Sequence, residues 1–182
     1  MDSTLFSIGH GNKSIEEFIE ELRSFDIAYL VDVRTSPYSK WNPQFNQSAL
    51  QNALTNLGVR YIYMGDVLGG LPNDSSCYTN GRIDYTKMAR KETFKLGLER
   101  LIVANQKKIR LAVMCSESEP EMCHRSKLIG QELIKRNISL QHIVEINKAV
   151  SQIDVINILT IGNGIMNLFG EEETLMSRKI YL

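Results

Sequence analysis

Cysteine is scarce in this chain, with three residues in a length of 182. So small and odd a number cannot form the disulfide framework of a small secreted protein, so we interpret Cys77, Cys115 and Cys123 as thiols of a reducing compartment. No apolar run approaches the roughly 20 residues that a membrane span requires, and the N-terminus lacks the basic and apolar segments of a signal peptide. We therefore expect a cytoplasmic protein without membrane contact.

Net charge is absent as well, because 21 lysines and arginines balance 21 aspartates and glutamates. No overall positive field attracts the chain to nucleic acid, so binding of that kind must be local. The charge is unevenly spread: no acidic residue lies between Asp32 and Asp66, and nine basic residues face three acidic ones from Arg82 to Arg110. The basic stretch is either a solvated helix face or a binding face.

Strand-like apolar runs alternate along the chain with helical periodicities. Strands are expected at 4–8, 29–33, 59–63, 109–114 and 141–146, and helices at 14–25, 48–57, 86–105 and 120–136. This alternation predicts a three-layer α/β fold, with about five mostly parallel strands and helices on both faces. We expect a single α/β domain over 1–150, with 151–182 as a C-terminal extension packed on the same domain. The tail after 150 fits either a helix or an edge strand.

Polar residues follow the predicted strands. His10 and Asn12 follow the first strand, Arg34 the second and Cys115 the fourth, while Gly69 and Gly70 lie in a turn-rich loop over 64–85 that follows the third. The carboxyl ends of parallel strands share one edge of a sheet, where open α/β folds bind ligands. The sequence therefore predicts one site built from several distant loops.

The loop from 114 to 126 carries the densest chemistry. Cys115 ends a strand, and Cys123, His124, Arg125 and Ser126 begin a helix, whose free amides bind anions and lower the pKa of a nearby thiol. We expect Cys115 as a nucleophile and His10 or His124 as its general base, with Glu117 as a further acid–base group. Arg34, Arg125 and the amides from Cys123 to Ser126 would hold the anion. The alternative is a buried structural thiol at Cys115, with Arg125 paired to nearby glutamates.

The same atoms could bind a metal, because Cys115, Cys123, His124 and His10 are four soft ligands. The spacing Cys-x7-Cys-His is not a compact zinc pattern, and no second Cys-x2-Cys pair occurs. The sequence therefore predicts no metal and no other cofactor.

A second informative stretch follows the second strand. Asp32 ends that strand and must accept hydrogen bonds there. Trp41 lies among Tyr38, Lys40 and Phe45 with no acidic residue nearby, a composition suited to stacking a ring beside a phosphate. The alternative is a small apolar core held by two prolines.

These residues together resemble a known family. The resemblance covers about Leu5 to Ile146 and rests on five ordered motifs: Ile8-Gly9-His10 with Asn12; Val31-Asp32-Val33-Arg34; Ser36-Pro37 with Asn42-Pro43-Gln44-Phe45-Asn46; Tyr63 with Leu68-Gly69-Gly70; and Met114-Cys115-x-Glu117 with Cys123-His124-Arg125. It identifies the chain as a member of the domain of unknown function 488 family, which implies no particular activity. The chain is more weakly similar to rhodanese-like and cysteine-phosphatase domains, although its cysteine-to-arginine separations of ten and two residues differ from theirs.

Two functions follow from these patterns. The first is an enzyme-like domain with an anion-binding site at the carboxyl edge of its sheet, acting through cysteine on a phosphorylated or nucleotide-like substrate. The second is a non-catalytic module that binds a nucleotide or nucleic acid through Trp41 and the basic stretch. The sequence predicts neither the substrate nor the oligomeric state.

Overall fold

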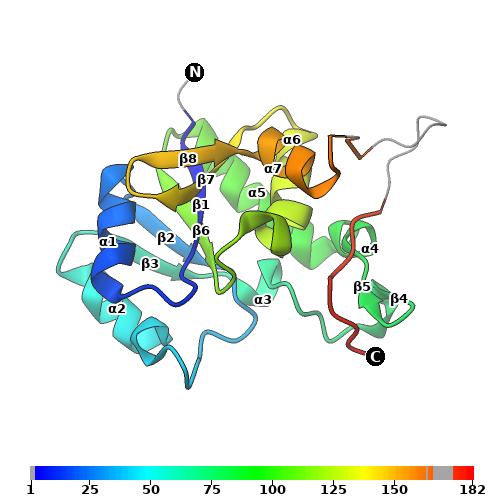
Figure 1. Cartoon of the computed structure of the whole chain (residues 1–182), viewed down its shortest axis with the longest axis horizontal. Coiled ribbons are helices and arrows are strands. Elements are labelled where there is room, and N and C mark those ends of the chain that lie inside the picture. The colour runs from blue at the N-terminus through cyan, green and yellow to red at the C-terminus, as the bar shows by residue number, and fades with distance from the viewer. Residues whose placement is uncertain (1–2, 163, 166–173) are drawn as a thin grey trace.

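The fold is built on a central sheet of six strands in the order β3-β2-β6-β1-β7-β8 (Figure 1). The computed structural model describes residues 3–162, 164–165 and 174–182. The strands are β1 (Leu5–Gly9), β2 (Tyr29–Asp32), β3 (Arg60–Tyr63), β6 (Leu111–Cys115), β7 (Leu140–Glu145) and β8 (Lys148–Ser151). All neighbours pair in parallel except β8, which is antiparallel to β7. The mostly parallel α/β prediction is confirmed, with six strands rather than about five.

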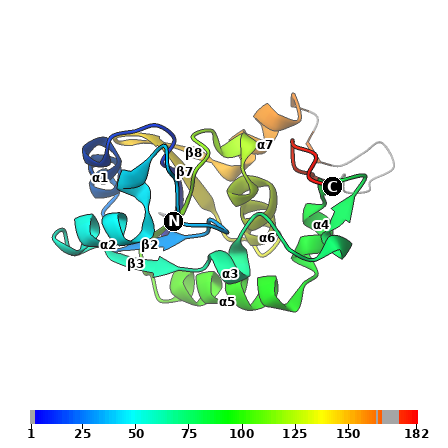
Figure 2. The same cartoon turned by 90° about the horizontal axis from the view of Figure 1, so that it is seen from below.

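Helices cover both faces of this sheet, so the prediction of three layers is confirmed (Figure 2). Helices α1 (Ile15–Ser24) and α2 (Gln47–Thr55) pack on one face, where Ile8 of β1 shares a buried cluster with Phe18. Helices α5 (Glu92–Gln106) and α6 (Gln131–Ile134) pack on the other. Side chains alternate along each strand, so one strand supplies both cores. No helix in the described part of the chain is long and apolar enough to cross a membrane.

Several expected elements are shorter or more broken than predicted. The helix expected over 86–105 is divided into α4 (Tyr85–Ala89) and α5, and the loop over 64–85 contains α3 (Gly65–Leu68), β4 (Tyr78–Thr79) and β5 (Arg82–Ile83). The helix expected over 120–136 consists of a 3-10 turn (Pro120–Met122), a π-helix termed η4 (Arg125–Gly130), and α6. Every residue of η4 is buried, so it lacks the polar face by which a surface helix is recognised.

The tail contributes two elements and a terminal segment to this fold. The edge strand β8 (Lys148–Ser151) crosses the expected boundary at residue 150, and α7 (Gln152–Leu159) follows it directly. The terminal segment 174–182 lies along β5: the amide of Ser177 donates to the carbonyl of Ile83 at 2.9 Å, and that of Tyr181 to Gly81 at 2.7 Å. The division into domain and extension stays a prediction.

A buried polar chain joins α7 to the sheet. Ser7 Oγ lies 2.6 Å from His142 Nδ1, and His142 Nε2 lies 2.7 Å from Gln152 Oε1. Because Gln152 Nε2 donates to the carbonyl of Ser126 at 3.1 Å, its Oε1 faces His142 as an acceptor. His142 therefore donates through Nε2 and accepts from Ser7 through Nδ1, which makes it a neutral imidazole.

This neutral imidazole predicts a particular loss of stability in acid. Burial lowers the pKa of His142 to about 3, whereas an unfolded histidine titrates near 6.5. Below about pH 6.5 the unfolded chain therefore binds a proton at this histidine and the folded chain does not. The free energy of unfolding then falls by up to about 1.4 kcal/mol for each pH unit. We expect His142→Gln to lose less unfolding free energy than the parent between about pH 6.5 and 4.5, measured by urea denaturation. Equal slopes in the two proteins would contradict the neutral, buried histidine.

Candidate functional site

A cavity of about 590 Å³ lies at the carboxyl edge of the sheet. Of the residues that the sequence predicted for the site, eight line it: His10, Asn12, Arg34, Gly70, Cys115, Glu117, Cys123 and His124. They come from the loops after β1, β2, β3 and β6 and from the residues that precede η4. The structure thus brings together residues more than 100 positions apart in the sequence.

The terminal segment also lines this cavity. Its lining includes four residues of this segment that were not predicted as site residues: Ser177, Arg178, Lys179 and Tyr181. The available signal was the pairing of two adjacent cations with a nearby tyrosine. That signal is weak, because an exposed basic tail is usually only solvated.

Five other predicted site residues lie outside the cavity lining. Asp32, Arg125 and Ser126 are completely buried, and a Cβ on Gly69 would lie 2.2 Å from the carbonyl oxygen of Gly65, so that glycine serves close packing. Trp41 is 80% exposed, with Lys40 Nζ 4.7 Å from its ring centroid. Their direct roles in binding stay predictions.

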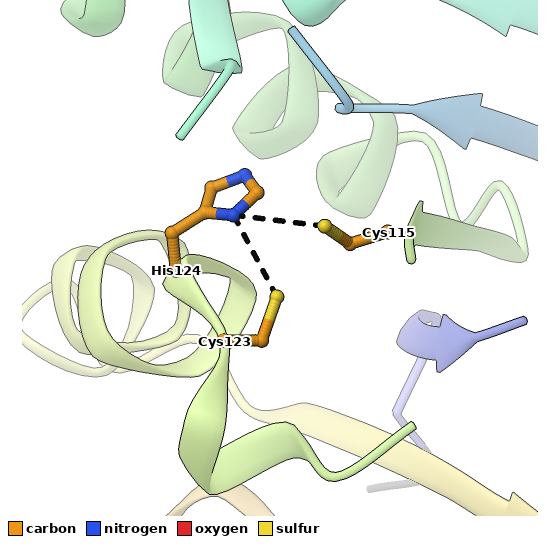
Figure 3. Close-up of side chains that lie close together, drawn as sticks. All are labelled: Cys115, Cys123 and His124. Carbon is orange, nitrogen blue, oxygen red and sulfur yellow. Dashed lines mark hydrogen bonds between the residues drawn. The ribbon is translucent and has the colours of Figure 1, made fainter. Parts of the chain in front are cut away.

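Two thiols and an imidazole meet in the cavity wall (Figure 3). His124 Nδ1 lies 3.8 Å from Cys115 Sγ and 3.6 Å from Cys123 Sγ. We call Cys115, Cys123 and His124 the thiol–imidazole cluster. The neighbouring Glu117 accepts a hydrogen bond from Cys115 Sγ at 3.1 Å. A Cβ on Gly70 would lie 2.6 Å from the His124 ring, so a glycine there allows the backbone to pack against the imidazole.

The two thiols differ in their electrostatic surroundings. The neighbouring Cys123 sulfur and burial together raise the pKa of Cys115 well above its usual value. Burial opposes ionisation of Cys123 too, but the neighbouring Cys115 thiol and the charge of Arg125 lower the pKa of Cys123. The Cys123 sulfur also accepts a hydrogen bond from the Arg125 amide at 3.5 Å. The role of Cys115 as a nucleophile stays a prediction.

Arg125 holds the loop that carries Glu117. Its Nη2 donates to the carbonyls of Glu117 at 2.9 Å and Ser118 at 2.7 Å. Gly9 leaves room for that loop, because a Cβ there would lie 1.9 Å from the Glu117 carbonyl oxygen. Within the described residues, Arg125 Nε and Nη1 and His124 Nε2 are buried without a hydrogen-bond partner. Arg125 therefore positions the Glu117 carboxylate beside Cys115 from within the core.

The second predicted base has other partners. His10 stacks on Phe45 with ring centroids 4.4 Å apart, its Nδ1 lies 2.9 Å from the Gly11 carbonyl, and its Nε2 lies 3.4 Å from Arg34 Nη1. Nδ1 must carry the proton to donate to that carbonyl, which leaves Nε2 to accept from Arg34. Burial lowers the pKa of His10, which favours the neutral form. Of the two predicted bases, His124 is therefore the one whose imidazole contacts Cys115.

A buried ion pair supports Arg34 at this edge. Arg34 Nη2 donates to Asp32 Oδ2 at 2.6 Å and to the Phe45 carbonyl at 2.8 Å. The Tyr61 hydroxyl donates to the same Asp32 oxygen at 2.7 Å. Asp32 thus receives the hydrogen bonds that a buried carboxylate requires.

Asp32→Asn should destabilise the fold by about 3–5 kcal/mol, because it leaves the Arg34 cation buried without its counter-ion. Glu99→Gln, on the exposed side of α5, is the matched control and should change stability by less than about 0.5 kcal/mol. Chemical denaturation of both variants measures the difference. Similar stabilities for the two would show that the ion pair contributes little.

Comparison with known proteins identifies one family. A model of the family described as domain of unknown function DUF488 matches residues 14–131, which is more than half of the chain. Comparisons with curated proteins and with solved structures gave no significant match. The matched region contains β2, β3, β6 and the thiol–imidazole cluster. The chain therefore belongs to the DUF488 family.

Proposed function

We propose that this protein is an enzyme acting on an anionic small molecule, phosphorylated or nucleotide-like, that binds in the carboxyl-edge cavity. The observation that carries the proposal is the joint lining of that cavity by cationic side chains and by the thiol–imidazole cluster. A ligand of nucleotide size fits a volume of about 590 Å³.

Cations on the cavity wall favour an anionic group. Arg178 and Lys179 are exposed at the rim, and neither forms a salt bridge within the described residues. Arg34 lines the inner wall, but Asp32 already balances its charge. The two rim cations therefore supply the attraction, and the planar guanidinium of Arg178 can hold two oxygens of a phosphate.

Beside these cations lie the groups that can perform chemistry. Cys115 is in contact with both Glu117 and His124, so a proton can move among a thiol, a carboxylate and an imidazole. This centre suits hydrolysis of the bound anion or transfer of one of its groups.

The rim cations give the first test. Thermal protection and calorimetry with inorganic phosphate, pyrophosphate, and nucleoside mono- and diphosphates should identify at least one ligand of the parent protein. Arg178→Ala/Lys179→Ala should weaken binding of that ligand about tenfold, which corresponds to about 1.4 kcal/mol. Lys107→Ala/Lys108→Ala is the control, because these exposed lysines precede β6 at the opposite edge of the sheet.

The same pair of variants separates the proposal from a nucleic-acid-binding module. Such a module would bind long polynucleotides with a steep salt dependence, and the lysines of the basic stretch would contribute to it. Polynucleotide binding that Lys107→Ala/Lys108→Ala weakens and the rim variant does not would contradict the small-anion proposal. Binding of none of the small anions would contradict it as well.

A further inference from the structure

We propose that Cys115, Cys123 and His124 bind a zinc ion. Their ligand atoms, two sulfurs and Nδ1, all lie within 4.8 Å of one another, and all three side chains are buried. In the described part of the chain, no other group of three histidine, cysteine or acidic side chains comes this close together. Figure 3 shows the ring nitrogen and both sulfurs directed toward one another.

The two sulfur–nitrogen distances are close to those of a tetrahedral zinc site. With zinc about 2.3 Å from sulfur and about 2.0 Å from nitrogen, tetrahedral angles place sulfur and nitrogen about 3.5 Å apart. The observed separations from His124 Nδ1 are 3.6 Å to Cys123 Sγ and 3.8 Å to Cys115 Sγ. An ion could therefore enter with small side-chain adjustments.

The donor set and its surroundings favour zinc over harder ions. Two thiolates and an imidazole are ligands that zinc prefers, whereas magnesium and calcium require oxygen. Binding would release the thiol protons of both cysteines to solvent. The buried guanidinium of Arg125, with Nε and Nη1 unpartnered among the described residues, lies next to Cys123 and offsets the negative charge of the thiolates.

Three protein ligands leave the fourth position of a tetrahedral site free, as in catalytic zinc centres. Because all three ligands line the cavity, that position is accessible to water or substrate. In the metal-free chain the Glu117 carboxylate accepts the Cys115 S–H hydrogen bond at 3.1 Å. When the ion displaces that proton, the carboxylate would be released and could accept a proton from a water at the fourth position, because zinc acidifies a water that it binds. This inference deepens the proposed function: the cysteines would be ligands, and water the nucleophile.

Metal content tests the inference without any substrate. The untagged chain, purified without chelator, should contain about one zinc per chain by elemental analysis. After zinc removal under reducing conditions, cobalt(II) should produce the visible absorption of a tetrahedral site and a thiolate-to-cobalt charge-transfer band. Cys115→Ser, Cys123→Ser and His124→Ala should each lose stoichiometric zinc and alter that spectrum. Cys77→Ser is the matched control, because Cys77 is also a buried free thiol but lies outside the cluster.

The spectrum of the parent protein keeps the test decisive even if a cluster variant does not fold. A parent chain that contains no zinc, and gives no charge-transfer band when titrated with cobalt, would overturn the inference. So would a disulfide between Cys115 and Cys123 in the freshly purified chain, found by mass spectrometry. Because these measurements involve no anionic ligand, a negative result leaves the rim-variant experiment able to support or contradict the proposed function separately.

Discussion

The site depends on one buried cation. Arg125 lies wholly inside the protein, where its guanidinium holds two carbonyls of the loop after β6 and its amide contacts the sulfur of Cys123. One residue therefore fixes Glu117 at one end of the loop and a thiol at the other. A charge that deep is costly without a counter-charge, and bonds to neutral carbonyls meet that cost only in part. The chain thus maintains a positive charge directly beside the Cys123 thiol.

The sequence predicted the layers of the fold well because their signals are local and periodic. The apolar run of β1 and the helical spacing after Ser14 are each complete within about ten residues. Helices were expected where η4 and α4 lie, but their boundaries were not. Burial on all sides removes the alternation of polar and apolar faces from η4, and α4 has only five residues. The antiparallel β8 was not predicted, because a four-residue edge strand is too short to show a periodicity of its own. The tail after 150, which fitted either a helix or an edge strand, forms α7 over most of its first ten residues.

The candidate site was predictable as far as the sheet topology determines it. His10, Arg34 and Cys115 follow parallel strands, so their meeting at one edge required no knowledge of contacts. The roles of individual side chains depend on packing, which the sequence pattern does not reveal. Spacing argued against a metal because zinc motifs are recognised within one short segment. In the proposed zinc site one ligand ends a strand and two others precede a buried helix, so the fold brings together side chains that the spacing separates.

The terminal segment has a consequence for diversity among related proteins. Main-chain hydrogen bonds between 177–182 and 81–83 hold this segment on β5, and bonds of that kind depend little on the side chains present. The region matched by the family ends at residue 131, so the rim cations lie outside it, whereas the thiols lie within it. Under the proposed function, the chain combines a reactive core that lies inside the family region with a selectivity element that lies outside it. A homologue could then acquire a new substrate by exchanging a few terminal residues, without altering the groups beneath them.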